Sequence, residues 1–387
     1  MPKGKGEIIM ATMKKIVALV MAFAMCAVCF AGCGAKTTNY AANNTEFFIG
    51  ATGPLTGDAS SYGISVQEGA QLAIDEINAN GGLNGITFKF DIKDDKATAA
   101  DAATGYDTLY EAGMQASIGS VTSGSCDSFA SKADEDKVFA ITPSASAANV
   151  IENRPTVFRV CFGDPDQGYL AAEEITANFE NIGAIYDTSD AYSSGIYEAF
   201  AAKMEELGVE FNTQTFDAEN KKDFSTQVEA LKDCDVIFLP IYYTEAGTIA
   251  KTAAAKGCEA LLFGCDGLDG LAGQLDESVT SEIRYITPFD ANSTDEVASK
   301  FVTAYETAYG RTPDQFAADG YDAVMTIYEA MKKANVTDVT ISPQALSDIL
   351  VSTITADDFT FKGATGEMTW DESGACTKVP QIVVLNK

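Results

Sequence analysis

Three loops, each following a short apolar segment, carry side chains suited to binding a small charged molecule. Residues 119–125 read GSVTSGS and residues 142–148 read TPSASAA, and each loop is rich in hydroxyl groups. Hydroxyls and free backbone N–H groups at the start of a helix favour a carboxylate without any basic side chain. The third loop, residues 266–270, reads DGLDG and offers a carboxylate to an ammonium group. Together the loops predict a site for a zwitterion.

Aromatic residues occupy comparable loop positions and could wall an apolar part of the same ligand. They are Tyr62, Tyr192, Tyr242, Tyr243 and Phe289. Each feature alone has an ordinary structural explanation. Ser and Thr before a helix are usually N-caps, Asp-Gly after a strand is usually a turn, and a single loop tyrosine is common. Only the order and spacing of the whole set point to a binding site.

The elements that must position these loops alternate between short β-branched or aromatic runs and helix-length amphipathic stretches. This alternation predicts an α/β fold with parallel sheets covered by helices. Ligands bind at the carboxyl ends of the strands in such sheets. The predicted strands are FFIGATG, ITFKFDIKD, ASIGSVT, VFAITPS, TVFRVCF, NIGAIYD, VEFNTQTF, DVIFLPIYY, ALLFGCD, RYITPF and QIVVLNK. Helices are expected through residues 66–77 with an end at 80–82, near 129, after 166, at 194–207, 224–231, 244–256 and 294–333, the last broken near 310–313.

The first 33 residues predict export and lipid attachment. Two lysines precede an unbroken apolar run over residues 16–31, which is shorter than a membrane-spanning helix requires. The run ends in Phe-Ala-Gly before Cys33, which resembles the signal of a bacterial lipoprotein, although Phe30 stands where Leu is usual. We therefore expect lipid on Cys33 and a location outside the cytoplasm, anchored to the cell membrane. The alternative is an ordinary signal peptide with a bystander cysteine.

Composition narrows the function of the remaining chain. Residues 34–46 are small and polar and predict a flexible tether. The residues after them are numerous enough for two domains. Lys and Arg number 26 against 56 Asp and Glu, a net charge of −30, so nucleic acid is not an expected partner.

The cysteines beyond Cys33 do not form a zinc motif. They are scattered, without a C-x₂-C pair, mostly in apolar segments where a thiol behaves as a small hydrophobe. They are Cys126, Cys161, Cys234, Cys258, Cys265 and Cys376. A disulfide between Cys258 and Cys265 remains conceivable, because a sequence cannot fix connectivity.

An enzyme is the first rival interpretation. The chain contains no histidine, which removes His-based triads and His metal sites. No G-x-S-x-G or P-loop motif is present. Composition leaves a Ser/Lys or carboxylate-pair hydrolase open, but we expect no catalysis, no cofactor and no metal.

Several stretches resemble the exported leucine/isoleucine/valine-binding proteins, which are type I periplasmic binding proteins that feed amino-acid ABC transporters. The clearest are IGATGPLTGDASSYGISVQEGAQLAIDEINANGG, IKDDKATAADA, GSVTSGSCDSFASKADEDKVFAITPSAS, RVCFGDPDQG, IYYTEAG and TPDQFAADGYDAV. The similarity covers nearly all of residues 47–387. It implies two Rossmann-like lobes, a three-strand hinge, and a ligand in the cleft between the lobes.

The resemblance also implies roles for particular residues. Ser123, Ala145 and Ser146 match positions that bind the α-carboxylate and amino group, Ala145 through its backbone. Tyr242 and Asp266 match the aromatic and acidic positions that hold the ammonium. Tyr62, Tyr192 and, less closely, Phe289 match side-chain-pocket positions. Ser146 replaces a common Thr, and Asp266 is one methylene shorter than the usual Glu.

From this resemblance we expect a monomeric receptor for an amino acid, of branched-chain type, that delivers its ligand to ABC permease subunits. Lobe 1 would comprise residues 47–163 and 290–373, and lobe 2 would comprise residues 164–289 and 374–387. A sensor or chemoreceptor accessory protein that binds an amide, urea or an aromatic acid is the alternative. A structural surface protein without any ligand is the third possibility.

Overall fold

The computed structural model describes residues 38–385. The predicted signal, Cys33 and residues 34–37 of the expected tether lie outside the described residues. From Tyr40 onward the chain forms one compact unit. Within residues 38–385, no helix combines the length and apolar character needed to cross a membrane.

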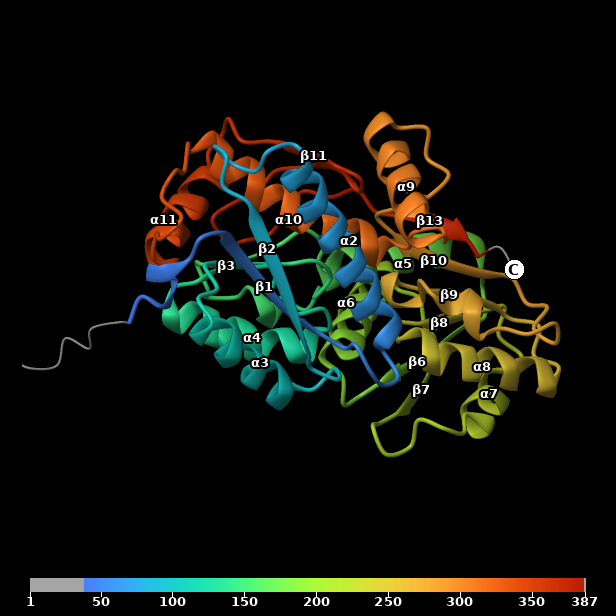
Figure 1. The fold of residues 1–387 in the computed structure, drawn as a ribbon. Helices are drawn as coiled ribbons and strands as arrows, with labels where there is room; N and C mark the ends of the chain where they lie inside the picture. Colours follow the sequence, from blue (N-terminus) through green and yellow to red (C-terminus); the bar gives the residue numbers. More distant parts are fainter. Residues whose placement is uncertain (1–37, 386–387) are drawn as a thin grey trace, which may run out of the picture. The chain divides into compact units, whose positions relative to one another are not determined.

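The first sheet contains five parallel strands in the order β2-β1-β3-β4-β5 (Figure 1). Its strands are β1 (Phe47–Gly53), β2 (Phe88–Asp94), β3 (Ala116–Ser117), β4 (Phe139–Thr142) and β5 (Val157–Arg159). Its helices are α2 (Ser60–Ala79), α3 (Ala99–Glu111), α4 (Ser123–Asp136), α9 (Glu296–Tyr309), α10 (Gln315–Lys333) and α11 (Pro343–Ile354). Helices α2 and α10 pack along each other, so the late helices complete the lobe that the early strands begin.

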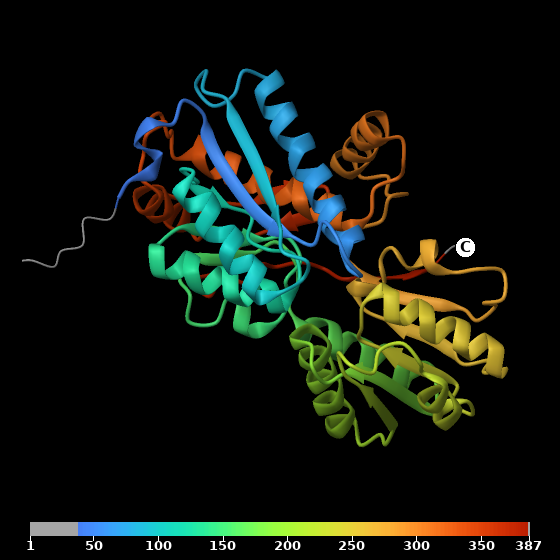
Figure 2. The same cartoon turned by 60° about the horizontal axis from the view of Figure 1, so that its bottom comes forward.

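The second sheet has the order β13-β10-β9-β8-β6-β7, and only β13 is antiparallel to its neighbour. Its strands are β6 (Ile182–Asp187), β7 (Asn212–Phe216), β8 (Val236–Leu239), β9 (Leu261–Gly264), β10 (Ile283–Thr287) and β13 (Gln381–Val384). Its helices are α5 (Asp164–Asn178), α6 (Ala191–Leu207), α7 (Ser225–Leu231) and α8 (Tyr243–Lys256). In Figure 2 this green-to-yellow part forms a body separate from the blue-to-teal first sheet.

Both sheets reverse their strand order at one point. In the first sheet β1 lies between β2 and β3, and in the second β6 lies between β7 and β8. The helices that follow the two strands on either side of such a reversal diverge to opposite faces, which leaves a crevice at the carboxyl ends of those strands. The fold therefore provides one binding crevice in each lobe.

Local sequence explains where the elements begin and end. Strand β1 is buried along its whole length, in keeping with its continuous run of apolar and small residues. The predicted break between α9 and α10 is confirmed: Gly310 ends α9 with φ 69°, and the Asp314 side chain accepts a hydrogen bond from Ala317 N at the start of α10. Glycine adopts this left-handed conformation without a steric penalty.

Helices α2 and α10 lie so close together at Gly69 that a side chain at this position would not fit. An added Cβ on Gly69 of α2 would collide with the carbonyl of Ala317 on α10. The glycine therefore sets the distance between the early and late parts of the first lobe.

All eleven predicted strands are present, but β3 covers only two of the seven residues expected of it. The sequence reading omitted α11 and the hairpin of β11 (Phe361–Gly363) and β12 (Gly366–Met368). Short 3-10 helices also form at Ala148–Val150, Asp266–Leu268 and Leu271–Gln274.

The packed chain begins before Phe47. Residues Tyr40–Asn43 form a 3-10 helix with Ala41 fully buried. The amide of Asn44 donates to Gly113 O and to the side chain of Gln115. The last part of the expected tether is therefore attached to the first lobe, because its amide and apolar groups find partners there.

The chain connects the lobes between β5 and α5, between β10 and α9, and before β13. Residues after Gly374 still contact the first lobe. Arg159 N donates to Gly374 O, and Lys378 forms an ion pair with Asp319 of α10.

Candidate functional site

Residues from the two strand reversals meet at one small cavity. Tyr62 and Ser123 follow β1 and β3 of the first sheet, and Tyr192 and Tyr242 follow β6 and β8 of the second. Asp266 follows β9 and begins the 3-10 helix Asp266–Leu268. The cavity is lined by Tyr62, Val121, Thr122, Ser123, Ser144, Tyr192, Tyr242, Asp266, Gly267 and Phe316. Five of the eight ligand-binding residues predicted from the sequence are among them.

The cavity measures about 10 Å³, which is room for about one water molecule. Four aromatic rings account for this small volume. The Tyr62 ring lies 4.1 Å from that of Phe316 and 5.6 Å from that of Tyr242. Tyr192 and Tyr242 stack at 5.0 Å. A ligand of amino-acid size can therefore enter only when the rings move or the lobes separate.

Direct hydrogen bonds hold the two lobes together across the cleft. The Tyr62 hydroxyl donates to Gly267 O and accepts from Tyr243 N. The Thr244 hydroxyl donates to Asp58 O at 2.8 Å. These are contacts between separate bodies, so they must break when the cleft opens.

Asp266 is buried in the second-lobe wall of the cavity. Its carboxylate accepts a hydrogen bond from the Tyr192 hydroxyl at 2.7 Å, and its backbone N–H donates to Gln167 Oε1. Burial raises the pKa of Asp266 to about 6, while the hydrogen bond from Tyr192 lowers it. No Lys or Arg of the described chain forms an ion pair with it. A buried carboxylate without a counter-ion is suited to an ammonium group.

The first-lobe side of the cavity is the start of α4. Ser123 is the first residue of this helix, and its hydroxyl accepts a hydrogen bond from Ala147 N. The N-cap residue Thr122 makes no side-chain capping bond. The positive end of the helix and its free N–H groups therefore face the cavity, which favours a carboxylate.

Ala145 and Ser146 lie beside the cavity and do not line it, whereas their neighbour Ser144 does. Ala145 N is used internally, because it donates to the Thr142 hydroxyl. The buried Ser146 hydroxyl has no hydrogen-bond partner.

Phe289 does not line the cavity that contains Asp266. It follows β10 and packs against Phe301 of α9 at 5.9 Å, in a different cavity from that of Asp266. The expected position of Phe289 in the ligand pocket therefore does not agree with the structure, because the chain turns toward α9 at this residue.

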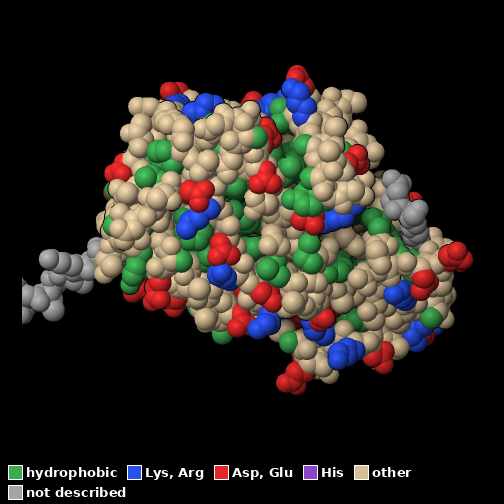
Figure 3. All heavy atoms as spheres, in the orientation of Figure 1, with side chains coloured by type: hydrophobic (Ala, Val, Ile, Leu, Met, Phe, Trp, Pro, Cys, Tyr) green, Lys and Arg blue, Asp and Glu red, His purple; other side chains and the backbone are tan. Residues whose placement is uncertain are grey.

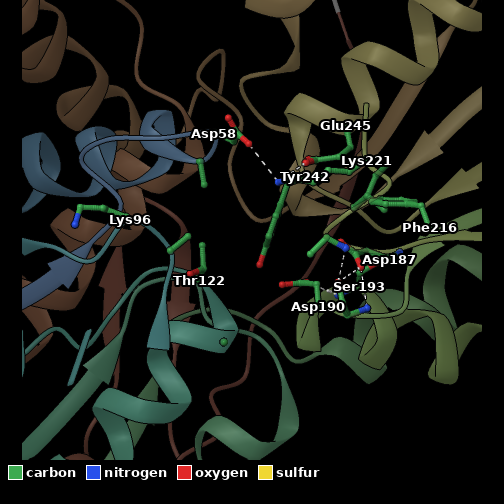
Figure 4. A pocket seen from close by; sticks show the side chains of 16 residues that line it. Asp58, Lys96, Thr122, Asp187, Asp190, Ser193, Phe216, Lys221, Tyr242 and Glu245 are labelled. Atoms are coloured by element: carbon green, nitrogen blue, oxygen red, sulfur yellow. Dashed lines mark hydrogen bonds and ion pairs between the residues drawn. The ribbon is translucent and has the colours of Figure 1, made fainter. Parts of the chain in front are cut away.

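A larger cavity of about 280 Å³ adjoins the site and opens between the lobes (Figure 4). Tyr242 lines both cavities. Lys221 lies within 3.2 Å of Asp58 and 3.1 Å of Glu245, so an ion pair bridges the lobes at this entrance. Burial raises the pKa of Asp190, which also lines the entrance, to about 6.

Sequence reasoning did not single out Phe316, Asp164 or Gln167, and it included Ser144 only as part of the loop 142–148. Phe316 stands in the quoted stretch TPDQFAADGYDAV, but nothing in that stretch indicates that its ring meets Tyr62. Asp164 and Gln167 stand in RVCFGDPDQG, which was quoted for its resemblance to the family, with the lobe boundary between residues 163 and 164. Burial raises the pKa of Asp164 to about 8.

The described residues show neither a disulfide nor a metal site. All six cysteines between residues 38 and 385 are free thiols, including Cys258 and Cys265. Over the same residues, no group of His, Cys, Asp and Glu side chains could hold a metal ion. On the face in Figure 3, Lys and Arg side chains are dispersed among acidic ones.

Comparison with known proteins agrees with this geometry. The Leu/Ile/Val-binding protein BraC3 of Rhizobium johnstonii is 26% identical over 86% of this chain and 90% of its own length. A leucine-binding protein LivK of Thermotoga maritima superimposes with a TM-score of 0.79 at 27% identity, covering 87% of this chain and 95% of that one. A branched-chain amino-acid transporter substrate-binding protein LivJ of Streptococcus pneumoniae, solved with isoleucine, has a TM-score of 0.79 at 28% identity over 88% and 96% of the chains.

The two-lobed architecture of these structures is the one predicted from the sequence and found here. Residues 46–374 also match the sequence profile of one family across both sheets. The chain therefore belongs to the periplasmic binding protein family.

Proposed function

We propose that this protein is the extracytoplasmic substrate-binding component of an ABC importer and that it binds an α-amino acid between its lobes. The observation that carries the proposal is the meeting of two opposite charges at one cavity. The start of α4 supplies the positive end of a helix, and Asp266 supplies a buried carboxylate from the other lobe. An α-amino acid has the complementary pair of charged groups.

The names of similar proteins support an aliphatic ligand. The Rhizobium and Thermotoga proteins are described as binding branched-chain amino acids, and the Streptococcus protein holds isoleucine. The aromatic wall of Tyr62, Phe316 and Tyr242 would pack against an aliphatic side chain. Among the residues that line the cavity there is no Lys or Arg to pair with a second carboxylate.

Hydrogen bonds to the charged head group can account for the affinity. Each bond to a charged group contributes about 1.5–3 kcal/mol. A micromolar dissociation constant corresponds to about 8 kcal/mol. Four or five such bonds, less the cost of ordering the site, are sufficient. The carboxylate would be bound by Ser123 and the loop of Ala145 and Ser146, and the ammonium by Asp266 and Tyr242.

The two lobes would close around the ligand as hinged bodies. We assign residues 47–163 and 290–373 to lobe 1 and residues 164–289 to lobe 2. The bonds that Gly374 and Lys378 make with Arg159 and Asp319 favour placing the third crossing after residue 378. Lobe 2 would then regain the chain at β13.

Lipid on Cys33 would hold the protein at the outer face of the cell membrane, where the permease subunits of the importer would receive the ligand. The stretch from Cys33 to Tyr40 would serve as the link between the lipid and the first lobe.

Ligand-dependent thermal stabilisation tests the proposal. Residues 34–387 are unfolded, freed of carried-over ligand and refolded, and their melting temperature is measured with single amino acids and related metabolites. A ligand at about 100 times its dissociation constant stabilises by about 2.7 kcal/mol, which is a shift of a few degrees.

The matched variants are Asp266→Asn at the site and Asp276→Asn at an exposed position of the same lobe. We expect the shift to disappear in the first variant and to persist in the second. Shifts only with ligands that lack an α-amino group would contradict the role of Asp266, and no shift with any ligand would contradict the receptor function.

A further inference from the structure

Buried polar atoms without hydrogen-bond partners are concentrated where the first hinge segment meets the ligand site. Most of those in the described chain belong to five residues of this region: Ser146, Arg159, Asp164, Gln167 and Tyr242. Buried polar groups in folded proteins are nearly always paired, so such a concentration calls for a specific explanation.

Asp164 is the least satisfied residue of this group. It is 2% exposed, and neither oxygen of its carboxylate has a partner. It has no ion pair with any Lys or Arg of the described residues. Its backbone N–H donates to Ser146 O, so it lies against the loop of the first lobe that follows β4.

The first turn of α5 packs against the loop that carries Asp266. Gln167 lies one turn after Asp164, on the same face of the helix. Gln167 Oε1 accepts from Asp266 N at 3.0 Å, and its Nε2 has no partner. The face of α5 that carries Asp164 is therefore the face turned toward Asp266.

Helix α6 leaves space for the carboxylate. A Cβ on Gly195 would collide with Asp164 Oδ2, and Tyr192, three residues earlier on the same helix, donates to Asp266. Asp164 thus lies between the Ser146 loop, α6 and the Asp266 loop. All three border the proposed head-group site.

The charged and titratable groups around Asp164 do not neutralise it. They are Arg159 of β5, Asp190 at the start of α6, Asp266 and Cys265 after β9, and Tyr242 after β8. Arg159 is the one cation, and its guanidinium donates to Ser146 O and Ala147 O. Burial first, and then the charges of Asp266 and Asp190, raise the pKa of Asp164. The charge of Arg159 and the nearby Ser146 hydroxyl lower it, although the geometry of that hydroxyl does not complete a hydrogen bond.

We propose that Asp164 is a second carboxylate of the head-group site, which acts with Asp266 to bind the cationic nitrogen of the ligand. This inference rests on the proposed function and names the feature that makes the site selective for an amine. An amino acid would be bound, and its 2-hydroxy or des-amino analogue would bind more weakly because it supplies no cation to the two buried carboxyl groups.

The proposal predicts that binding releases a proton. With a pKa of about 8 in the free protein, the Asp164 carboxyl is about nine-tenths protonated at pH 7. A bound ammonium group favours the ionised form, so Asp164 loses this proton on binding. Affinity should therefore rise with pH up to about 8, by at most tenfold per unit.

The experiment is isothermal titration calorimetry of the refolded protein with the amino acid that gives the largest thermal shift and with its 2-hydroxy analogue. Titrations in phosphate and in Tris at pH 7 give the number of protons released, because the two buffers differ in ionisation enthalpy. The variant is Asp164→Asn, which keeps the shape of the side chain. Asp166→Asn on the same helix turn is the matched control, since Asp166 is exposed and its carboxylate accepts a hydrogen bond from Gly163 N.

For the wild-type protein and Asp166→Asn we expect release of about one proton. In Asp164→Asn we expect almost no release, at least tenfold weaker binding of the amino acid at pH 8, and unchanged or tighter binding of the 2-hydroxy analogue. If Asp164 only shaped the hinge, Asp164→Asn would weaken the binding of both ligands equally, and this result would overturn the proposal.

The outcomes separate this inference from the proposed function. If Asp266→Asn abolishes binding but Asp164→Asn binds and releases protons as the wild type does, the role of Asp164 is overturned and the receptor function remains. If the wild-type protein binds its amino acid without proton release between pH 6 and 8, the role of Asp164 is overturned without any variant. If no amino acid binds, both proposals fall.

Discussion

Replacing Lys378 by Met should destabilise the protein strongly, because it removes one partner of a buried ion pair. Lys378 Nζ lies 2.8 Å from Asp319 Oδ1, and the two side chains are 1% and 2% exposed. Burial alone would lower the pKa of Lys378, but the carboxylates of Asp319 and Asp322 raise it above its usual value. The amine is therefore charged throughout the physiological range. Methionine keeps most of the aliphatic stem and removes only the charge.

The size of the effect depends on the protonation state of Asp319. Removing one partner of a buried pair costs about 3–5 kcal/mol when the other charge is left uncompensated. Asp319 can limit that cost by binding a proton, and burial already raises its pKa to about 7 in the wild type. We therefore expect the loss to stay below about 3 kcal/mol at pH 7 and to approach about 3–5 kcal/mol at pH 9, where that proton is harder to bind.

The pH dependence of the penalty distinguishes the loss of a charge pair from a packing defect, because a packing defect should cost the same at every pH. Burial raises the pKa of Asp319 to about 7 even though Lys378 lowers it, so the wild type loses stability as pH rises from about 4 to 7. Removing Lys378 should raise this pKa further, so the variant continues to lose stability above pH 7. The penalty of the variant should therefore grow by up to about 1.4 kcal/mol per unit as pH rises from 7 to 9.

Urea unfolding of the wild type, Lys378→Met and Lys378→Met with Asp319→Leu at pH 7, 8 and 9 measures these effects. The double variant should recover much of the loss. Lys300→Met is the control, since Lys300 and Glu296 form a pair that is 74% and 80% exposed, and its loss should stay below about 1 kcal/mol. A penalty for Lys378→Met that equals that of Lys300→Met, or that does not change with pH, would refute the reasoning.

Two further predictions concern helix packing and lobe closure. Gly69→Ala should lower the free energy of unfolding in urea by about 1–3 kcal/mol, because the added Cβ would overlap the backbone of Ala317. The control Gly273→Ala should cost much less, because its added Cβ would meet no atom. Equal losses in the two variants would contradict the close approach of α2 and α10. Tyr62→Phe should weaken ligand binding about tenfold by calorimetry and speed ligand release in stopped flow, since it removes two hydrogen bonds between the lobes at about 0.5–1.5 kcal/mol each. Unchanged affinity in that variant would show that these bonds do not stabilise the closed protein.

Most of the strand pattern was readable from the sequence because buried parallel strands are continuous apolar runs. FFIGATG and DVIFLPIYY each gave a strand in the expected place. The glycine at the end of α9 and the Asp314 cap of α10 are local signals as well, so the break between those helices was predicted. The extent of β3 was not, because hydrogen bonds to the neighbouring strands decide how far a strand continues.

The residues of the candidate site also divide into those that the sequence indicated and those that only the packing placed. Ser123, Tyr242 and Asp266 follow strands at positions that any α/β sheet brings to its carboxyl edge, so their types and order were informative. Phe289 also follows a strand, but the turn after β10 directs it to α9. Phe316 reaches the cavity from a helix that sequence patterns alone place only on the outside of the first lobe.

The sequence by itself determined the class of fold and the character of the head-group loops, because both depend on patterns within a few residues, and its resemblance to a known family implied the two lobes. Only the tertiary structure decided which side chains share the cavity and which remain unpaired. Asp164 illustrates the difference. In the sequence it is one acid among many at a helix start, and its burial without an ion-pair partner arises from the packing of three segments that are far apart in the chain.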